Sequence, residues 1–98
     1  MTKFALLIEM KAKPGMEADV EAFLAKEASL VKGEPGTLTW HGSRIEGEMG
    51  VYRVFDTFAD EAGREAHLNG PAGQEFVDKA GELFSEAKVY RLKVIAHK

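Results

Sequence analysis

Segments with the periodicity of β-strands and of α-helices follow one another along this chain in one restrictive order. Strands show alternating or continuous apolar residues, whereas helices show apolar residues three and four positions apart. The strand-like segments are 3–13, 37–46, 51–58 and 87–96, and the main helical segments run between Pro14-Gly15 and Gly33 and from Asp60 to about Leu68. The order β-α-β-β-α-β predicts a ferredoxin-like α+β fold, in which an antiparallel four-stranded sheet carries helices on one face.

Capping and turn residues mark the ends of the helical segments. Asp60 has the side chain of an N-cap, and Gly33 followed by Pro35 ends the first helix. Asn69-Gly70-Pro71 ends the second helix and starts a short third helical stretch, which is expected to close at Gly81.

Segments 37–46 and 51–58 are expected to form a β-hairpin through a turn-like, glycine-flanked sequence. A turn centred on Glu48 and Met49 would place Arg44 opposite Arg53 and His41 opposite Asp56. Like charges opposite each other are unfavourable, so the arginine pair either lies where water screens it or marks an anion site.

The alternation sorts large apolar side chains onto both faces of the predicted sheet. One face is expected to carry Ala5, Leu7, Leu38, Trp40, Val51 and Phe55. The other face is expected to carry Phe4, Leu6, Ile8, Tyr52, Val54 and Phe58. Helices on one side leave the second face uncovered, and soluble monomers rarely expose a large apolar patch. Packing of two such sheets face to face therefore predicts a homodimer, in which the uncovered face that carries Trp40 and Phe55 is buried between the sheets.

Composition restricts the class of protein and its partners. With 98 residues, 45% of them apolar, the chain is expected to form a single domain, 1–98. It contains no cysteine, which excludes disulfides, thiolate metal ligands and a cysteine nucleophile and predicts a cytoplasmic protein. A net charge of −3 without a basic run argues against a nucleic-acid partner. The apolar run 4–8 is too short to span a membrane.

The second main helix carries a stripe of small residues, Ala62, Gly63 and Ala66, which allows it to lie close to the sheet. His67 stands beside this stripe, one turn after Gly63, and can point into the gap between helix and sheet as a base. Alternatively, it caps the carbonyls at the end of the helix or contacts solvent.

A second histidine, His41, lies on a predicted strand with Asp56 opposite and Tyr52 nearby. A histidine–aspartate pair can fix a tautomer and poise a base, although such pairs are also ordinary at sheet surfaces. Tyr52 and Phe58 are expected either in the core or along a ligand cavity.

No metal or cofactor motif accompanies these residues. The histidines 41, 67 and 97 lie far apart on different elements, and no glycine-rich phosphate loop follows a strand. A serine nucleophile elbow is also missing. We therefore expect neither a metal nor an organic cofactor.

Short motifs along most of the chain resemble the antibiotic biosynthesis monooxygenase family. They are Lys13-Pro14-Gly15, Glu34-Pro35-Gly36-Thr37, the strand 51–58 with Asp60-Glu61-Ala62 after it, and Ala66-His67-Leu68-Asn69-Gly70-Pro71. The resemblance implies a dimeric α+β barrel with a pocket between sheet and helices in each subunit. Some members oxidise phenols or quinols with O₂ without metal, flavin or haem. His67 matches the histidine of this family, and Phe58 matches the aromatic residue before it.

The related haem-degrading members combine the histidine with a tryptophan and with an asparagine in the first strand. This chain has Phe58 and Ile8 at those positions. Ile8 cannot make the polar contact of the asparagine, so the departure argues against haem degradation.

The sequence therefore predicts a cofactor-independent monooxygenase-like protein that acts on a small aromatic, phenolic or quinol-type molecule. His67 is the expected base or anion stabiliser, and Phe58, Tyr52, Ile8 and His41 are expected to line the pocket. Two alternatives stay open, because fold does not fix function. One is a non-catalytic dimeric module for binding or stress response, and the other is an isomerase or lyase on the same barrel.

Overall fold

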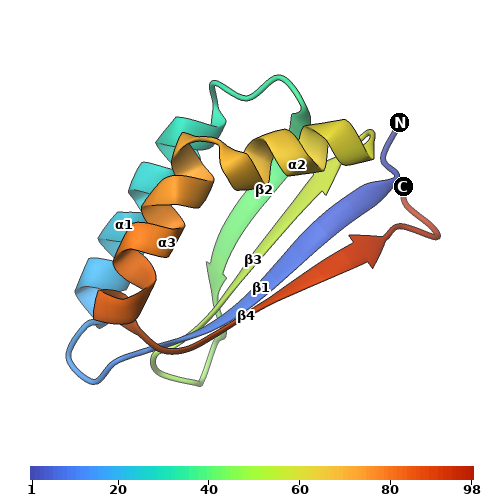
Figure 1. Ribbon diagram of the computed structural model, residues 1–98. Helices are drawn as coiled ribbons and strands as arrows, with labels where there is room; N and C mark the ends of the chain where they lie inside the picture. Colours follow the sequence, from blue (N-terminus) through green and yellow to red (C-terminus); the bar gives the residue numbers. More distant parts are fainter.

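The computed structural model, which describes residues 1–98, is a four-stranded antiparallel sheet with three helices against one face (Figure 1). The elements in chain order are β1 (Phe4–Ala12), α1 (Glu17–Val31), β2 (Thr37–Arg44), β3 (Val51–Phe58), α2 (Glu61–Asn69), α3 (Pro71–Leu83) and β4 (Phe84–Lys93). The strand order is β2-β3-β1-β4, so β1 and β3 are central. This architecture confirms the predicted α+β, ferredoxin-like fold.

The junction of α3 and β4 differs from the prediction. Helix α3 continues through Gly81 to Leu83, and β4 begins at Phe84 rather than at Ala87 and ends at Lys93. The ring of Phe84 packs against Phe23 and Phe76, with centroids 6.2 and 5.8 Å apart. This aromatic cluster, rather than the glycine, fixes where the chain leaves the helix.

The predicted register of the β2–β3 hairpin is wrong by one residue. The structure pairs Trp40 with Asp56, His41 with Phe55, Ser43 with Arg53, and Arg44 with Tyr52. The reason is a loop with an odd number of residues between Ile45 and Val51, closed by a backbone hydrogen bond of 2.9 Å. Gly47 and Gly50 adopt positive φ angles of 82° and 78° in this loop, a conformation that glycine adopts without strain.

This register also removes the predicted contact between the two arginines, because Arg44 and Arg53 point to opposite faces of the sheet. On the helix side, Arg44 donates a hydrogen bond of 2.7 Å to Glu21. On the other side, Arg53 lies 3.4 Å from Glu9. Each arginine therefore pairs with its own carboxylate. The two predicted alternatives, a solvent-screened arginine pair and an anion site, do not apply.

The core lies between the helices and one face of the sheet. Its buried residues are Ile8, Met10, Ala12, Val20, Phe23, Leu24, Tyr52, Val54, Leu83 and Phe84. Trp40 packs against this core, so the prediction that it lies on the uncovered face is wrong. Leu38 was expected on that face too, but it lines a hollow with Trp40 and Val31 of α1. The one-residue shift in register moves these strand positions to the helix side.

The uncovered face of the sheet carries one row of large side chains across all four strands. The backbone pairing places His41, Phe55, Leu7 and Tyr90 side by side in this row. Phe55 and Tyr90 remain 42% and 41% exposed. No helix of the structure is both long enough and apolar enough to cross a membrane.

Candidate active site

Helix α2 begins at a well-formed N-cap, which sets the position of the histidine in its last turn. The Asp60 carboxylate accepts a hydrogen bond of 2.7 Å from the Gly63 amide. A Cβ atom on Gly63 would lie only 2.9 Å from the carbonyl oxygen of Gly36, so α2 packs directly on the segment before β2. One turn later, His67 points inward and is buried.

The His67 ring lies between two carboxylates from different parts of the chain. Nδ1 lies 2.7 Å from Oε1 of Glu34, and Nε2 lies 3.0 Å from Oδ2 of Asp56 on β3. The ring of Phe58 packs beside it, with centroids 5.5 Å apart. Burial lowers the pKa of His67, but the contacts with Asp56 and Glu34 outweigh burial and raise that pKa above its usual value. The ring is thereby favoured as an imidazolium with both nitrogens engaged.

Asp56 is fully buried and partners His67 instead of His41, which corrects the predicted His41–Asp56 pair. Asp56 faces the helices, whereas His41 belongs to the row on the uncovered face. Neither carboxylate oxygen of Asp56 has another hydrogen-bond partner, so the His67 ring, 3.0 Å from Oδ2, provides the compensation for this buried charge.

A partly enclosed pocket of about 200 Å³, the enclosed pocket, lies next to His67, between the sheet and the three helices. Its lining residues are Ile8, Leu24, Glu27, Trp40, Val54, His67, Leu68, Ala72, Gly73, Phe76, Val77 and Val89. Only Glu27 and His67 among them are ionisable, so the walls are apolar apart from two side chains. Apolar walls with a few polar groups are typical of small-molecule sites.

Glu27 is an ionisable residue of the pocket that was not predicted from the sequence. Its side chain is only 6% exposed, and its Oε2 atom has no hydrogen-bond partner. Burial raises the pKa of Glu27 to about 7, more than the opposing charge of His67 lowers it. A signal was present in the sequence, because Glu27 occupies the apolar stripe of α1 with Phe23, Leu24 and Val31.

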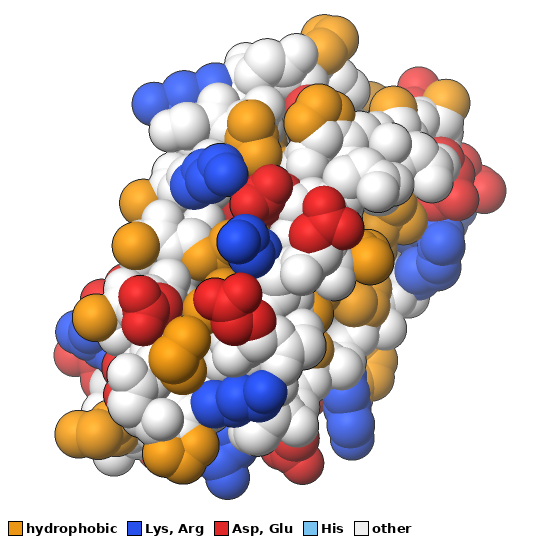
Figure 2. Space-filling view, turned by 60° about the vertical axis from the view of Figure 1, so that its left-hand side comes forward, with side chains coloured by type: hydrophobic (Ala, Val, Ile, Leu, Met, Phe, Trp, Pro, Cys, Tyr) orange, Lys and Arg blue, Asp and Glu red, His pale blue; other side chains and the backbone are white.

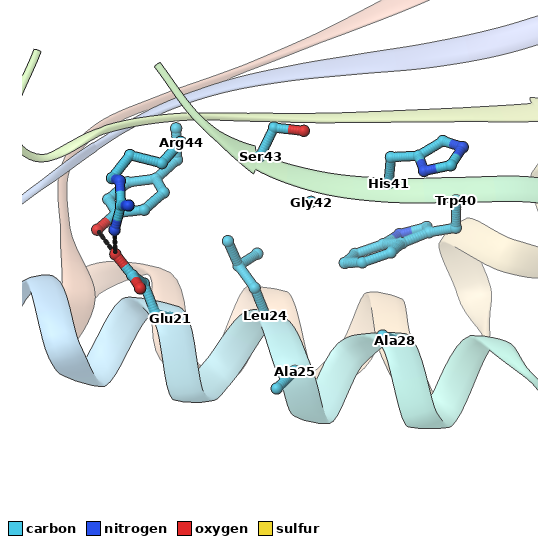
Figure 3. Close-up of a pocket in the computed structure, with 10 residues that line it drawn as sticks. Glu21, Leu24, Ala25, Ala28, Trp40, His41, Gly42, Ser43 and Arg44 are labelled. Carbon is cyan, nitrogen blue, oxygen red and sulfur yellow. Dashed lines mark hydrogen bonds and ion pairs between the residues drawn. The ribbon is translucent and has the colours of Figure 1, made fainter. Parts of the chain in front are cut away.

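The predicted site residues separate into two groups. His67 and Ile8 line the enclosed pocket, and Phe58 is buried beside the His67 ring. Tyr52 and His41 do not reach this pocket. They border a different, open hollow of about 530 Å³ between α1 and β2, where the side chain of His41 points away from α1 (Figure 3).

The polar groups of the open hollow satisfy one another. Glu21 accepts hydrogen bonds from the Tyr52 hydroxyl at 2.9 Å and from Arg44 at 2.7 Å (Figure 3). These contacts lower the pKa of Glu21. Burial and the hydrogen bond to Glu21 raise the pKa of Tyr52 to about 12, so its hydroxyl stays protonated at neutral pH. Chemistry is therefore better supported in the enclosed pocket, where a carboxyl oxygen is free.

No three of the histidine and acidic side chains in the structure are grouped so that they could hold a metal ion. The enclosed pocket instead offers mostly apolar walls, a histidine whose pKa is raised and one unpaired carboxyl group. Such a cavity can bind a small aromatic molecule, move a proton at Glu27 and stabilise negative charge near His67.

Comparison with known proteins gives a family and a fold. The chain matches the sequence model described as antibiotic biosynthesis monooxygenase over residues 3–79. A solved protein of unknown function from Nitrosomonas europaea is 39% identical, with a TM-score of 0.92, and the match covers 100% of this chain and 94% of that chain. No protein among the curated ones matches the chain.

Two further solved structures are similar at lower identity. A protein from Pseudomonas aeruginosa is 21% identical, with a TM-score of 0.86, over 98% of this chain and 97% of that chain. A protein from Caulobacter crescentus, described as a candidate antibiotic biosynthesis monooxygenase, is 21% identical, with a TM-score of 0.83, over 97% of this chain and 92% of that chain. At this identity they show the fold alone.

Proposed function

This chain belongs to the antibiotic biosynthesis monooxygenase family, and from this membership we propose that it oxidises a small phenolic or quinol-type molecule with O₂, without a metal, flavin or haem. The observation that carries the proposal is the enclosed apolar pocket with His67 in its wall. We place the reaction in the cytoplasm, because a chain without cysteine forms no disulfides and needs no oxidising compartment.

The substrate supplies all the electrons in this reaction. A phenol with a free para position takes up O₂ and yields a para-quinone and water, so no external reductant is needed. The phenol must first lose its proton, because the phenolate transfers an electron to O₂ more readily. Apolar walls such as Ile8, Val54 and Phe76 would hold the ring and exclude water from the reactive intermediates.

His67 acts in this proposal as a fixed positive charge rather than as a free base. Both of its ring nitrogens contact carboxylates, Glu34 at 2.7 Å and Asp56 at 3.0 Å, so neither is free to take a substrate proton. The imidazolium would stabilise the phenolate and the reduced oxygen that forms beside it. Of the two roles predicted for His67, the geometry supports the anion stabiliser.

Oxygen uptake with 1-naphthol tests the proposal. Each molecule of 1-naphthol should consume one O₂ and give 1,4-naphthoquinone, which is detected by its absorbance. We expect a rate well above that of a buffer blank, and substitution of His67 should lower it. Binding of 1-naphthol without oxygen uptake would contradict the monooxygenase activity. It would support a second candidate function, a non-catalytic binding module, which is favoured by the contacts of both His67 ring nitrogens with carboxylates.

We also propose that the protein functions as a homodimer joined through the uncovered sheet face. The row of His41, Phe55, Leu7 and Tyr90 supports this, because it would leave large apolar groups in water in a monomer. The outer face of α1 and α3 is different, since acidic, basic and apolar side chains are interspersed there (Figure 2). That face is suited to solvent.

A further inference from the structure

Glu27 is the one acidic side chain in the enclosed pocket whose charge has no partner. The charged groups around it come from four parts of the chain: His67 on α2, Glu75 on α3, Glu34 before β2 and Lys26 on its own helix. Lys26 is paired with Glu75 at 3.0 Å, and His67 is held by Glu34 and Asp56. No neighbouring cation is therefore free for Glu27.

A buried carboxyl group without a partner is unfavourable for folding, and a leucine would fill the same place on the apolar stripe of α1 more favourably. Glu27 nevertheless stands at the wall of the pocket, with Oε2 unpartnered and the side chain 6% exposed. An atom from a bound molecule is the partner that this geometry lacks.

We propose that Glu27 contacts the hydroxyl group of the bound phenol and accepts its proton. The O–H bond of the phenol breaks, the proton moves to the Glu27 carboxylate, and the electron pair stays on the phenolate oxygen. This inference deepens the proposed function and rests on it in so far as the ligand is a phenol. The role of Glu27 is then catalytic, whereas Glu34 and Asp56 position His67.

The surrounding charges also restrict the ligand class. Ionised Glu27 carries a negative charge that no neighbouring cation is free to balance, so the wall at Glu27 is negative before any ligand enters. A ligand with a carboxylate of its own would be repelled, whereas a neutral hydroxylated ring would not. The site therefore selects uncharged phenols.

The protonation behaviour of Glu27 agrees with this role. Burial places the pKa of Glu27 at about 7, so the carboxylate and the acid are both populated near neutral pH. A base of this pKa can take up a proton and release it again in one catalytic cycle.

The fluorescence of bound 2-naphthol tests proton transfer without any need for turnover. Excited 2-naphthol is a strong acid, and the naphtholate emits at longer wavelength than the naphthol when an acceptor takes the proton. We expect wild-type protein at pH 8 to show naphtholate emission from the bound probe. Glu27→Gln, which keeps the shape but lacks a basic oxygen, should bind the probe within about threefold and lose most of that emission.

Glu75→Gln is the matched control, because it removes a carboxylate of α3 that lies outside the pocket lining. This variant should keep the naphtholate emission. The carboxylate-bearing probe 6-hydroxy-2-naphthoic acid should bind at least roughly tenfold more weakly than 2-naphthol by calorimetry. Equal binding of the two probes would contradict the charge argument.

The outcomes separate this inference from the proposed function. Naphtholate emission that is unchanged in Glu27→Gln, or a failure of 2-naphthol to bind wild-type protein at millimolar concentration, overturns the assignment of Glu27. Emission that depends on Glu27 upholds the assignment, even where 1-naphthol causes no oxygen uptake and the monooxygenase is thereby excluded. Oxygen uptake that is equal in wild type and Glu27→Gln leaves the monooxygenase standing and removes Glu27 from it.

Discussion

Asp56 Oδ2 lies 3.0 Å from His67 Nε2, and this contact joins the centre of the sheet to helix α2. Asp56 is fully buried, so the histidine is at once a wall of the pocket and the counter-ion of a strand residue. The proposed function and the stability are therefore coupled at His67, so the effect of a substitution there must be measured on both.

The first prediction concerns His67→Ala, which leaves Asp56 and Glu34 buried without their cation. We expect the free energy of unfolding to fall by about 3–5 kcal/mol in urea titrations, because breaking a buried ion pair strands a charge. Turnover of 1-naphthol should fall by roughly 10²-fold or more.

The double variant His67→Gln with Asp56→Asn separates the two effects. It removes one of the two stranded charges, so we expect it to recover part of the lost stability while turnover stays low. Recovery of turnover together with stability would mean that His67 serves the fold alone.

The second prediction is that the protein loses stability as the pH rises from 5 to 8. Burial raises the pKa of Glu27 from 4.5 to about 7, so the folded protein binds its proton more tightly than the unfolded chain. Its contribution, up to about 3 kcal/mol, is present below pH 4.5 and is lost by about pH 7.

His67 changes the stability in the same direction. Its pKa in the folded protein is raised above 6.5, so its contribution to the free energy of unfolding is lost as the pH rises through that folded pKa. Urea titrations at several pH values should show the decline. Glu27→Gln should make it shallower, and a stability that rises from pH 5 to 8 in the wild type would contradict this assignment.

The third prediction is that Glu27→Leu stabilises the protein at pH 8. Leucine extends the apolar stripe of α1 and removes an ionised carboxylate that has no partner. We expect a gain of about 1–3 kcal/mol in the free energy of unfolding. Glu75→Gln, which breaks only a surface ion pair, should change stability by less than about 1 kcal/mol. A loss of stability in Glu27→Leu would indicate a polar partner that holds the carboxylate in the ligand-free protein.

Much of the fold was predictable from local periodicity and caps, as the N-cap at Asp60 and the strand 51–58 illustrate. The hairpin register was not, because it depends on whether the loop after Ile45 holds an odd or an even number of residues. A shift of one residue places each side chain of β2 on the opposite face of the sheet. Trp40 therefore lines the pocket, whereas His41 lies on the uncovered face.

The candidate site was predictable only in part, for a related reason. His67 was predicted from its place beside the small-residue stripe of α2 and from the family resemblance, and Ile8 from the resemblance alone. Glu34 and Asp56, in contrast, meet the His67 ring from distant segments that no local spacing relates. Glu27 was detectable as a charge on an apolar stripe. Its lack of a partner, however, is a property of the packed structure.

The fourth prediction tests the close approach of α2 to the segment before β2. Gly63→Ala would place a Cβ atom 2.9 Å from the Gly36 carbonyl oxygen, so α2 must shift and carry His67 with it. We expect a loss of about 1–3 kcal/mol in stability and weaker binding of 2-naphthol. Gly81→Ala is the control, because a Cβ atom there meets nothing within 4 Å in helix α3. That change should raise stability by up to about 1 kcal/mol. If Gly63→Ala and Gly81→Ala destabilise the protein equally, the close approach of α2 to Gly36 is not the cause of the loss.

The fifth prediction concerns the uncovered sheet face. Phe55→Lys places a charge in the middle of the row that we propose as the dimer interface, and its Cα partners are His41 and Leu7. We expect light scattering at micromolar concentration to change from the mass of two chains to that of one, because the charge would be buried without a partner. Ile95→Lys is the control, since Ile95 is 96% exposed beyond β4 and should leave the dimer intact.

Trp40→Lys distinguishes the two faces of the sheet. Trp40 lines the enclosed pocket, so its substitution should weaken the binding of 2-naphthol and leave the mass in light scattering unchanged. A dimer that persists in Phe55→Lys but dissociates in Trp40→Lys would mean that the chains associate through the helix side, and it would move the pocket into the interface.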